Sequence, residues 1–233
     1  MTTTHARTGP QAPGAAGSLE LSDAVELLGL VAQLEHVAFA RLAADAALAP
    51  TVEQRLELSR FAAAAVERRD RVLARIAEIG GDPVAALHQY DDVLDDFDAR
   101  TQPGSWWERL LTSYVGYGVA DDFCRLAAEG LDPGSRTVVL EVLDDASHAD
   151  LAVAELDAAG AADGVLTARL ALWGRRLVGE ALGVVQRLLV QRPALVRLLS
   201  AGSAGAPAEP PTKLFGELTA QHTRRMSRLG LTA

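Results

Sequence analysis

Residues 26–46 read ELLGLVAQLEHVAFARLAADA, and this stretch decides the fold class. Apolar residues recur along it every three or four positions, which predicts an amphipathic α-helix that buries one stripe. The stripe consists of Leu28, Ala32, Phe39, Leu42 and Ala46. Glu35 lies in the middle of this stripe, where its carboxylate loses hydration unless a cation, a donor or a metal ion compensates it. The stretch therefore predicts a core helix with a buried carboxylate.

Capping and stop signals place the other helices. Thr51 is a suitable N-cap, and Gly80-Gly81 a suitable C-terminal stop, for a second helix over residues 51–79. We expect the first helix over residues 18–47 and further helices over 105–129, 134–159, 163–191 with a final turn to Ser200, and 213–229. Residues 82–104 contain Pro83, an acidic run and Pro103-Gly104, which predicts a long crossover with at most a short helix.

These elements predict an all-α protein. Two helix pairs with short internal turns, joined by a crossover of more than twenty residues, are typical of a ferritin-like four-helix bundle, whereas up-down bundles use short loops throughout. Additional C-terminal helices follow the bundle. We expect a disordered tail over 1–17, the bundle over 18–200, a linker over 201–211 and a C-terminal docking helix over 212–233.

Composition excludes several classes of function. Aromatic residues make up 5% of the chain, too few for a groove that stacks single-stranded nucleic acid. Cys124 is the one cysteine, which excludes an intrachain disulfide and a thiolate cluster. The N-terminal segment lacks the apolar core of a signal peptide. The longest apolar stretches carry charges such as Arg175 and Glu180, so we expect no membrane span and a cytoplasmic protein.

The net charge of −9 is unevenly distributed. From residue 161 onward there are ten Lys and Arg residues against four Asp and Glu residues, a balance of +6 that leaves −15 for the rest. A basic C-terminal third could attract a polyanion such as tRNA. Alternatively, it packs on the acidic first part of the same chain.

Candidate metal ligands occur on three helices. A di-metal carboxylate bundle needs a Glu on each of two helices and a Glu-x-x-His on each of the other two. Glu35 fits the first helix, and Asp122 lies on the apolar face of the third, while Asp121 lies nearer the edge and is expected to be solvated. On the fourth helix, Asp145 and His148 have the three-residue spacing that places a carboxylate and an imidazole on one face.

The second helix lacks a ligand pair. Its inward positions three residues apart are Ala65 and Arg68. A guanidinium carries a fixed positive charge and no acceptor, so Arg68 cannot bind a cation, but it can neutralise Glu35. An ion pair or a network among Glu35, Arg68 and Asp122 would then replace the metal.

Five segments carry a family resemblance: residues 26–30 (ELLGL), 35–45 (EHVAFARLAAD), 114–123 (YVGYGVADDF), 172–182 (LWGRRLVGEAL) and 222–226 (HTRRM). Over residues 20–230 the chain resembles an actinobacterial ferritin-like family related to the non-haem di-iron hydroxylases of a hypermodified tRNA adenosine. The resemblance implies the ligands Glu35, Asp122, Asp145 and His148. Ala65 and Arg68 stand where that family has a second-helix Glu and His, so the resemblance implies iron at one site at most.

Three functions follow as hypotheses. The first is an iron-dependent oxidoreductase or hydroxylase with a degenerate site, whose catalytic residues the sequence does not assign. The second is a metal-free scaffold or homodimeric interaction protein with a Glu35–Arg68 core pair. The third is a tRNA-binding role through the C-terminal arginines. His222, on an apolar stripe of the last helix, is expected to be a docked structural histidine.

Overall fold

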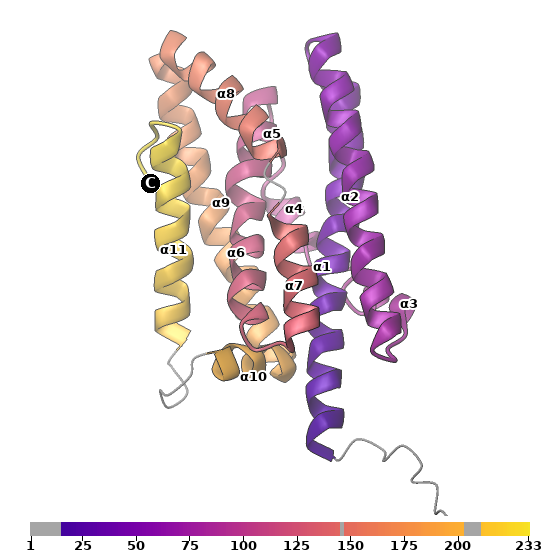
Figure 1. Ribbon diagram of the computed structural model, residues 1–233. Helices are drawn as coiled ribbons and strands as arrows, with labels where there is room; N and C mark the ends of the chain where they lie inside the picture. Colours follow the sequence, from indigo (N-terminus) through magenta and orange to yellow (C-terminus); the bar gives the residue numbers. More distant parts are fainter. Residues whose placement is uncertain (1–14, 145–146, 203–210) are drawn as a thin grey trace, which may run out of the picture.

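The computed structural model describes residues 15–144, 147–202 and 211–233, with side chains other than those of 15–19, 147–148 and 211–212. The regular elements of this part are all helical, which confirms the all-α prediction (Figure 1). In chain order they are α1 (Ala15–Leu48), α2 (Val52–Glu78), α3 (Pro83–His88), α4 (Asp95–Arg100), α5 (Trp106–Leu111), the π-helical turn η1 (Thr112–Gly116), α6 (Tyr117–Ala128), α7 (Pro133–Leu143), α8 (Ser147–Ala162), α9 (Gly164–Gln191), α10 (Pro193–Gly202) and α11 (Pro211–Arg228).

Helices α1 and α2 form a long antiparallel hairpin (Figure 1). Thr51 starts α2 through a capping box, because its hydroxyl accepts from the backbone N–H of Gln54 while the Gln54 side chain accepts from the N–H of Thr51, both at 3.2 Å. Gly80 ends the hairpin with a φ of 84°, a left-handed conformation that glycine adopts without strain. Both predicted boundary signals are confirmed.

The crossover holds two short helices, α3 and α4, where one at most was expected. It returns the chain to the opposite end of the bundle, so that α5 and α6 run in the same direction as α2 (Figure 1). Helix α3 lies close against α1 at Gly29, where a Cβ atom would be 2.4 Å from the backbone oxygen of Ala86. The hydroxyl of Tyr90, beyond α3, donates to Glu26 on α1 at 2.7 Å. The predicted ferritin-like topology is therefore present.

The third and fourth helices differ from the predicted single rods. The third consists of α5, η1 and α6, and its central turn is π-helical. The fourth was expected as one helix over 134–159, and this was wrong: α7 ends at Leu143, and α8 begins at Ser147. The first helix begins at Ala15, inside the tail expected over 1–17. Of the linker expected over 201–211, residues 201–202 belong to α10 and residue 211 to α11, while 203–210 lie outside the described residues.

Helices α9 and α11 lie on the side of the bundle away from the α1–α2 hairpin, whereas α10 crosses one end of the bundle and contacts α1 (Figure 1). Asp163 caps α9, and Pro193 begins α10, as the proline signal predicted. Helix α11 then packs along α6 and α9. As a result α6 is enclosed by five helices, α1, α7, α9, α10 and α11, and its buried side chains face in several directions.

One helix of the described chain has the length and composition of a membrane span, contrary to the expectation from sequence. It covers residues 20–48 of α1, with a mean hydropathy of 1.3 in its most apolar window. Half of that window is buried inside the bundle, as for the core helix of a packed domain. The cytoplasmic location stays a prediction.

Candidate functional site

The buried carboxylate of α1 is held by an arginine of α2. Nε of Arg68 donates to Oε2 of Glu35 at 2.9 Å, and both residues are less than a tenth exposed. Arg68 belongs to the face of α2 that also buries Ala65 and Val72. The predicted Glu35–Arg68 ion pair is therefore confirmed.

Asp122 does not join that pair, and the predicted network of three residues is wrong. Asp122 faces α11, where Arg225 donates from Nη1 to Oδ2 at 2.6 Å and from Nη2 to Oδ1 at 2.7 Å. Gly118 makes room for this arginine, because a Cβ atom there would lie 2.7 Å from its Nε. The sequence pattern of the third helix gave no sign of a partner 103 residues away.

Asp121 is half-buried and lines a cavity together with Glu35 and Arg68. The expectation that it is solvated holds only in part, because the same side chain also lines this cavity. Burial raises the pKa of its carboxyl, against the opposing charge of Arg225. The π-helical turn adds a residue to the register, so faces calculated at about 100° per residue do not carry across it.

The cavity lies between α1, α2, α6 and α7, the four helices that form the bundle core. The volume in which the centre of a water molecule fits is about 40 Å³, which is more than a single bound water needs. Four charged side chains line the cavity, and so do apolar ones. The lining is Leu34, Glu35, Ala38, Arg41, Leu42, Arg68, Tyr117, Asp121, Val142 and Leu143.

Arg41 is held against this cavity by an aromatic ring. Its guanidinium carbon lies 3.5 Å from the centroid of Tyr117, a cation–π contact. The hydroxyl of Tyr117 donates to Asp98 of α4 at 2.6 Å, which fixes the ring. Nε and Nη1 of Arg41 are buried and have no hydrogen-bond partner in the structure. Sequence reasoning missed Arg41, and the available signal was a lone cation in an alanine-rich stretch.

In the described part of the chain, the predicted metal ligands do not come together at one site. Glu35 and Asp122 each pair with an arginine, Asp145 lies outside the described residues, and so does the side chain of His148. Ala65 offers no ligating atom. Within the described part of the chain, no group of three or more His, Cys, Asp and Glu side chains could hold a metal ion. These residues do not fit a di-iron centre, and the four-ligand set stays a prediction.

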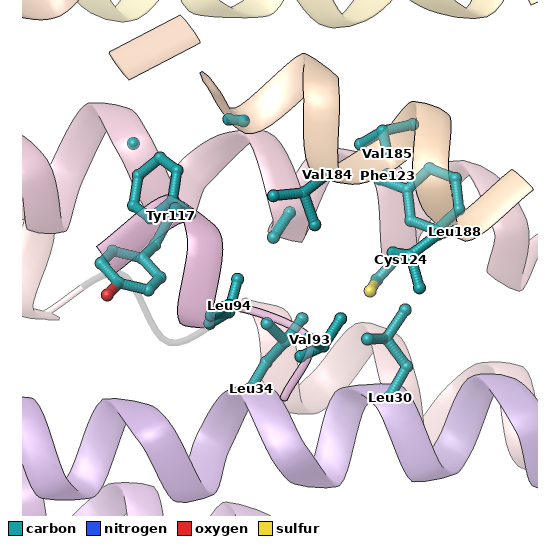
Figure 2. A pocket seen from close by; sticks show the side chains of 14 residues that line it. Leu30, Leu34, Val93, Leu94, Tyr117, Phe123, Cys124, Val184, Val185 and Leu188 are labelled. Atoms are coloured by element: carbon teal, nitrogen blue, oxygen red, sulfur yellow. The ribbon is translucent and has the colours of Figure 1, made fainter. Parts of the chain in front are cut away.

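A second, apolar pocket lies beside the polar cavity, between α1, the crossover, α6 and α9 (Figure 2). Leu34 and Tyr117 line both spaces. The sulfur of Cys124 points into the apolar pocket, among Leu30 and Val93 (Figure 2), and burial raises the pKa of this thiol. The pocket offers only about 20 Å³ to the centre of a water-sized sphere, so it has no room for an organic ligand without movement of its walls.

Helix α11 docks through His222, as expected. His222 is 1% exposed, and neither ring nitrogen has a hydrogen-bond partner in the structure. Burial lowers its pKa to about 4, and the nearby charge of Arg225 acts in the same direction. Met226 packs where Gly174 of α9 lacks a side chain. The imidazole is therefore neutral and structural.

The basic C-terminal third packs on the acidic part of the same chain, one of the two alternatives from sequence. Six of its arginines pair with carboxylates of residues 1–160, at distances of 2.5 to 3.7 Å. The pairs are Arg169–Glu108, Arg187–Asp96, Arg192–Glu26, Arg197–Asp23, Arg225–Asp122 and Arg228–Asp150.

The helical bundle with one long crossover defines a ferritin-like protein. Comparison with protein families agrees, because residues 21–202 match the family described as the ferritin-like domain of actinomycetes. The chain belongs to this family. No curated protein matches it. Helix α11, which supplies Arg225, lies beyond the matched residues.

Proposed function

We propose that this protein is a metal-independent member of the ferritin-like fold that works by binding or as a scaffold, rather than by di-iron oxidation. The observation that carries the proposal is the buried contact between Arg68 and Glu35. The guanidinium cannot lose its proton near neutral pH, and it occupies the carboxylate that a first-helix metal ligand would provide. A divalent cation bound at Glu35 would be repelled by this fixed positive charge.

The pairing of Asp122 supports the same proposal. Both of its oxygens accept from Arg225, and the guanidinium neutralises the charge that would attract a metal ion. Two of the four predicted ligands are thus neutralised by arginines from different helices. The competing hypothesis, a degenerate iron site used for hydroxylation, keeps Asp145 and His148 as its remaining ligands.

Elemental analysis decides between the two. The protein is purified from medium rich in iron and manganese, without chelators, and its metal content is measured by mass spectrometry. We expect less than about a tenth of a metal ion per chain, since carboxylates that are already neutralised by arginines attract a cation only weakly. Iron or manganese near one per chain, lost in Asp122→Ala and His148→Ala, would contradict the proposal and support the oxidoreductase.

A designed variant provides a control for the measurement. Ala65→Glu combined with Arg68→His restores the carboxylate and the histidine that the second helix lacks. We expect this double variant to take up more iron than the parent under the same conditions. The homodimer and the tRNA interaction stay predictions. Light scattering on the purified protein tests the first, and salt-dependent tRNA binding tests the second.

A further inference from the structure

Arg41 has buried donors that the chain does not satisfy. Nε and Nη1 of its guanidinium have no acceptor in the structure, although both atoms are shielded from bulk solvent. Buried charged donors without partners are unfavourable, so native proteins place a group or a ligand against them. The polar cavity is the space that Arg41 lines.

The guanidinium is also held in place. Its central carbon lies 3.5 Å from the centroid of the Tyr117 ring, and the Tyr117 hydroxyl donates to Asp98. A guanidinium stacked on a ring directs its N–H groups outward in its own plane. Arg41 is therefore a cation held in place at the wall of the cavity.

Among the described residues, no ion pair joins Arg41 to either carboxylate that lines the cavity. Arg68 and Glu35 neutralise each other at 2.9 Å. Asp121 is the other carboxyl that lines the cavity, but neither Nε nor Nη1 of Arg41 donates to it. Water could satisfy the donors of Arg41, but only an anion would also balance its charge.

We propose that this cavity binds a small carboxylate, with the anionic oxygens on Arg41 and a short apolar group against Leu34, Ala38 and Leu42. The size supports an acid of about three to five heavy atoms, since the space exceeds that of one water but is far below a drug-sized pocket. The proposal rests on the proposed function, because it needs Glu35 to remain paired with Arg68.

Acetate is the probe for the test. Thermal unfolding of the full-length protein is followed as sodium acetate replaces sodium chloride at constant ionic strength and pH, and binding is measured directly by ¹³C-acetate NMR. We expect saturable stabilisation of the parent. Arg41→Gln should weaken acetate binding at least about tenfold, because a charge-assisted contact is lost. Arg60→Gln, on an exposed position of α2, is the matched control and should bind as the parent does.

A second variant covers the case in which Arg41→Gln does not fold. Ala38→Val fills the apolar wall of the cavity without touching the guanidinium, and it should also weaken acetate binding. The proposal is overturned if acetate and chloride act alike on the parent, because water alone then fills the cavity. It is also overturned if Arg41→Gln, or Ala38→Val in its place, binds acetate as tightly as the parent.

Metal analysis of the same samples separates this inference from the proposed function. If the protein is metal-free and does not bind acetate, the carboxylate site is overturned and the proposed function stands. Stoichiometric metal with acetate binding that disappears after chelation overturns the metal-independent function and this inference together. Metal-free protein with Arg41-dependent acetate binding supports both.

Discussion

Arg225 and Asp122, on helices α11 and α6, form a two-pronged ion pair with donor–acceptor distances of 2.6 and 2.7 Å. Asp122 is 8% exposed, and the Arg225 side chain is 20% exposed. The contact therefore fixes the last helix on the bundle through a largely desolvated pair of charges. Removing one partner leaves the other without compensation.

Replacement of Arg225 by Met should destabilise the protein by about 2–4 kcal/mol, because Asp122 stays buried without its partner. Urea unfolding followed by circular dichroism measures this difference. Arg224→Met on the same helix is the control, since that side chain is 65% exposed and should change stability by less than about 0.5 kcal/mol. Equal effects of the two substitutions would contradict a structural role for the Asp122 pair.

Replacement of Glu35 by Gln should lower the free energy of unfolding by about 3–5 kcal/mol, because it leaves the Arg68 guanidinium without its anion in the core. The double variant Glu35→Leu, Arg68→Met should recover most of this loss, since an apolar pair removes both buried charges. Chemical denaturation of the two single variants and the double variant gives the coupling energy. A coupling near zero would show that the pair is not the core contact described here.

Replacement of Asp121 by Asn should stabilise the protein progressively as the pH rises. The raised pKa means that folded Asp121 holds its proton more tightly than unfolded Asp121, so stability is complete below the unfolded pKa of about 3.9 and falls as pH rises through the folded pKa. Asn cannot ionise and avoids this loss. Melting temperatures at pH 5 and pH 8 test it, with the exposed Asp157→Asn as control. A variant difference that does not grow with pH counts against the partly buried position of Asp121.

His222 should make the protein sensitive to acid. Its folded pKa of about 4 lies below the unfolded value of about 6.5, so its neutral form supports the fold above pH 6.5, and this support is lost as pH falls toward 4. The loss amounts to about 3 kcal/mol at pH 4. His222→Leu should reduce the difference in unfolding free energy between pH 7 and pH 4 by about that amount. His88→Gln, at a side chain that is 81% exposed, should leave the difference nearly unchanged.

Gly29 should tolerate no larger residue. A Cβ atom there meets the backbone oxygen of Ala86 at 2.4 Å, so Gly29→Ala must push α3 away from α1 and should cost about 1–3 kcal/mol. Gly179→Ala, in a helical position with open space around it, should instead stabilise by about 0.5–1 kcal/mol. Thermal unfolding of both variants tests whether the crossover is anchored at this contact.

The sequence predicted features that depend on local chemistry or on one regular helix. The Thr51 cap, the Gly80 stop and the Glu35–Arg68 pair belong to this kind, since capping and helical periodicity place them. The sequence did not predict the surroundings of Asp121 and Asp122. The π-helical turn η1 changes the helical register before these residues, and α6 is enclosed by other helices on several sides. Sequence reasoning also could not find Arg41 and Tyr117, whose contact joins two helices through a ring rather than through a sequence pattern.

The position of α11 outside the matched residues bears on how the domain is delimited. A fragment designed on residues 21–202 would omit Arg225, His222 and Met226 together. It would leave Asp122 uncovered and expose the groove beside Gly118 and Gly174. The matched segment is thus shorter than the packed helical unit that the structure describes.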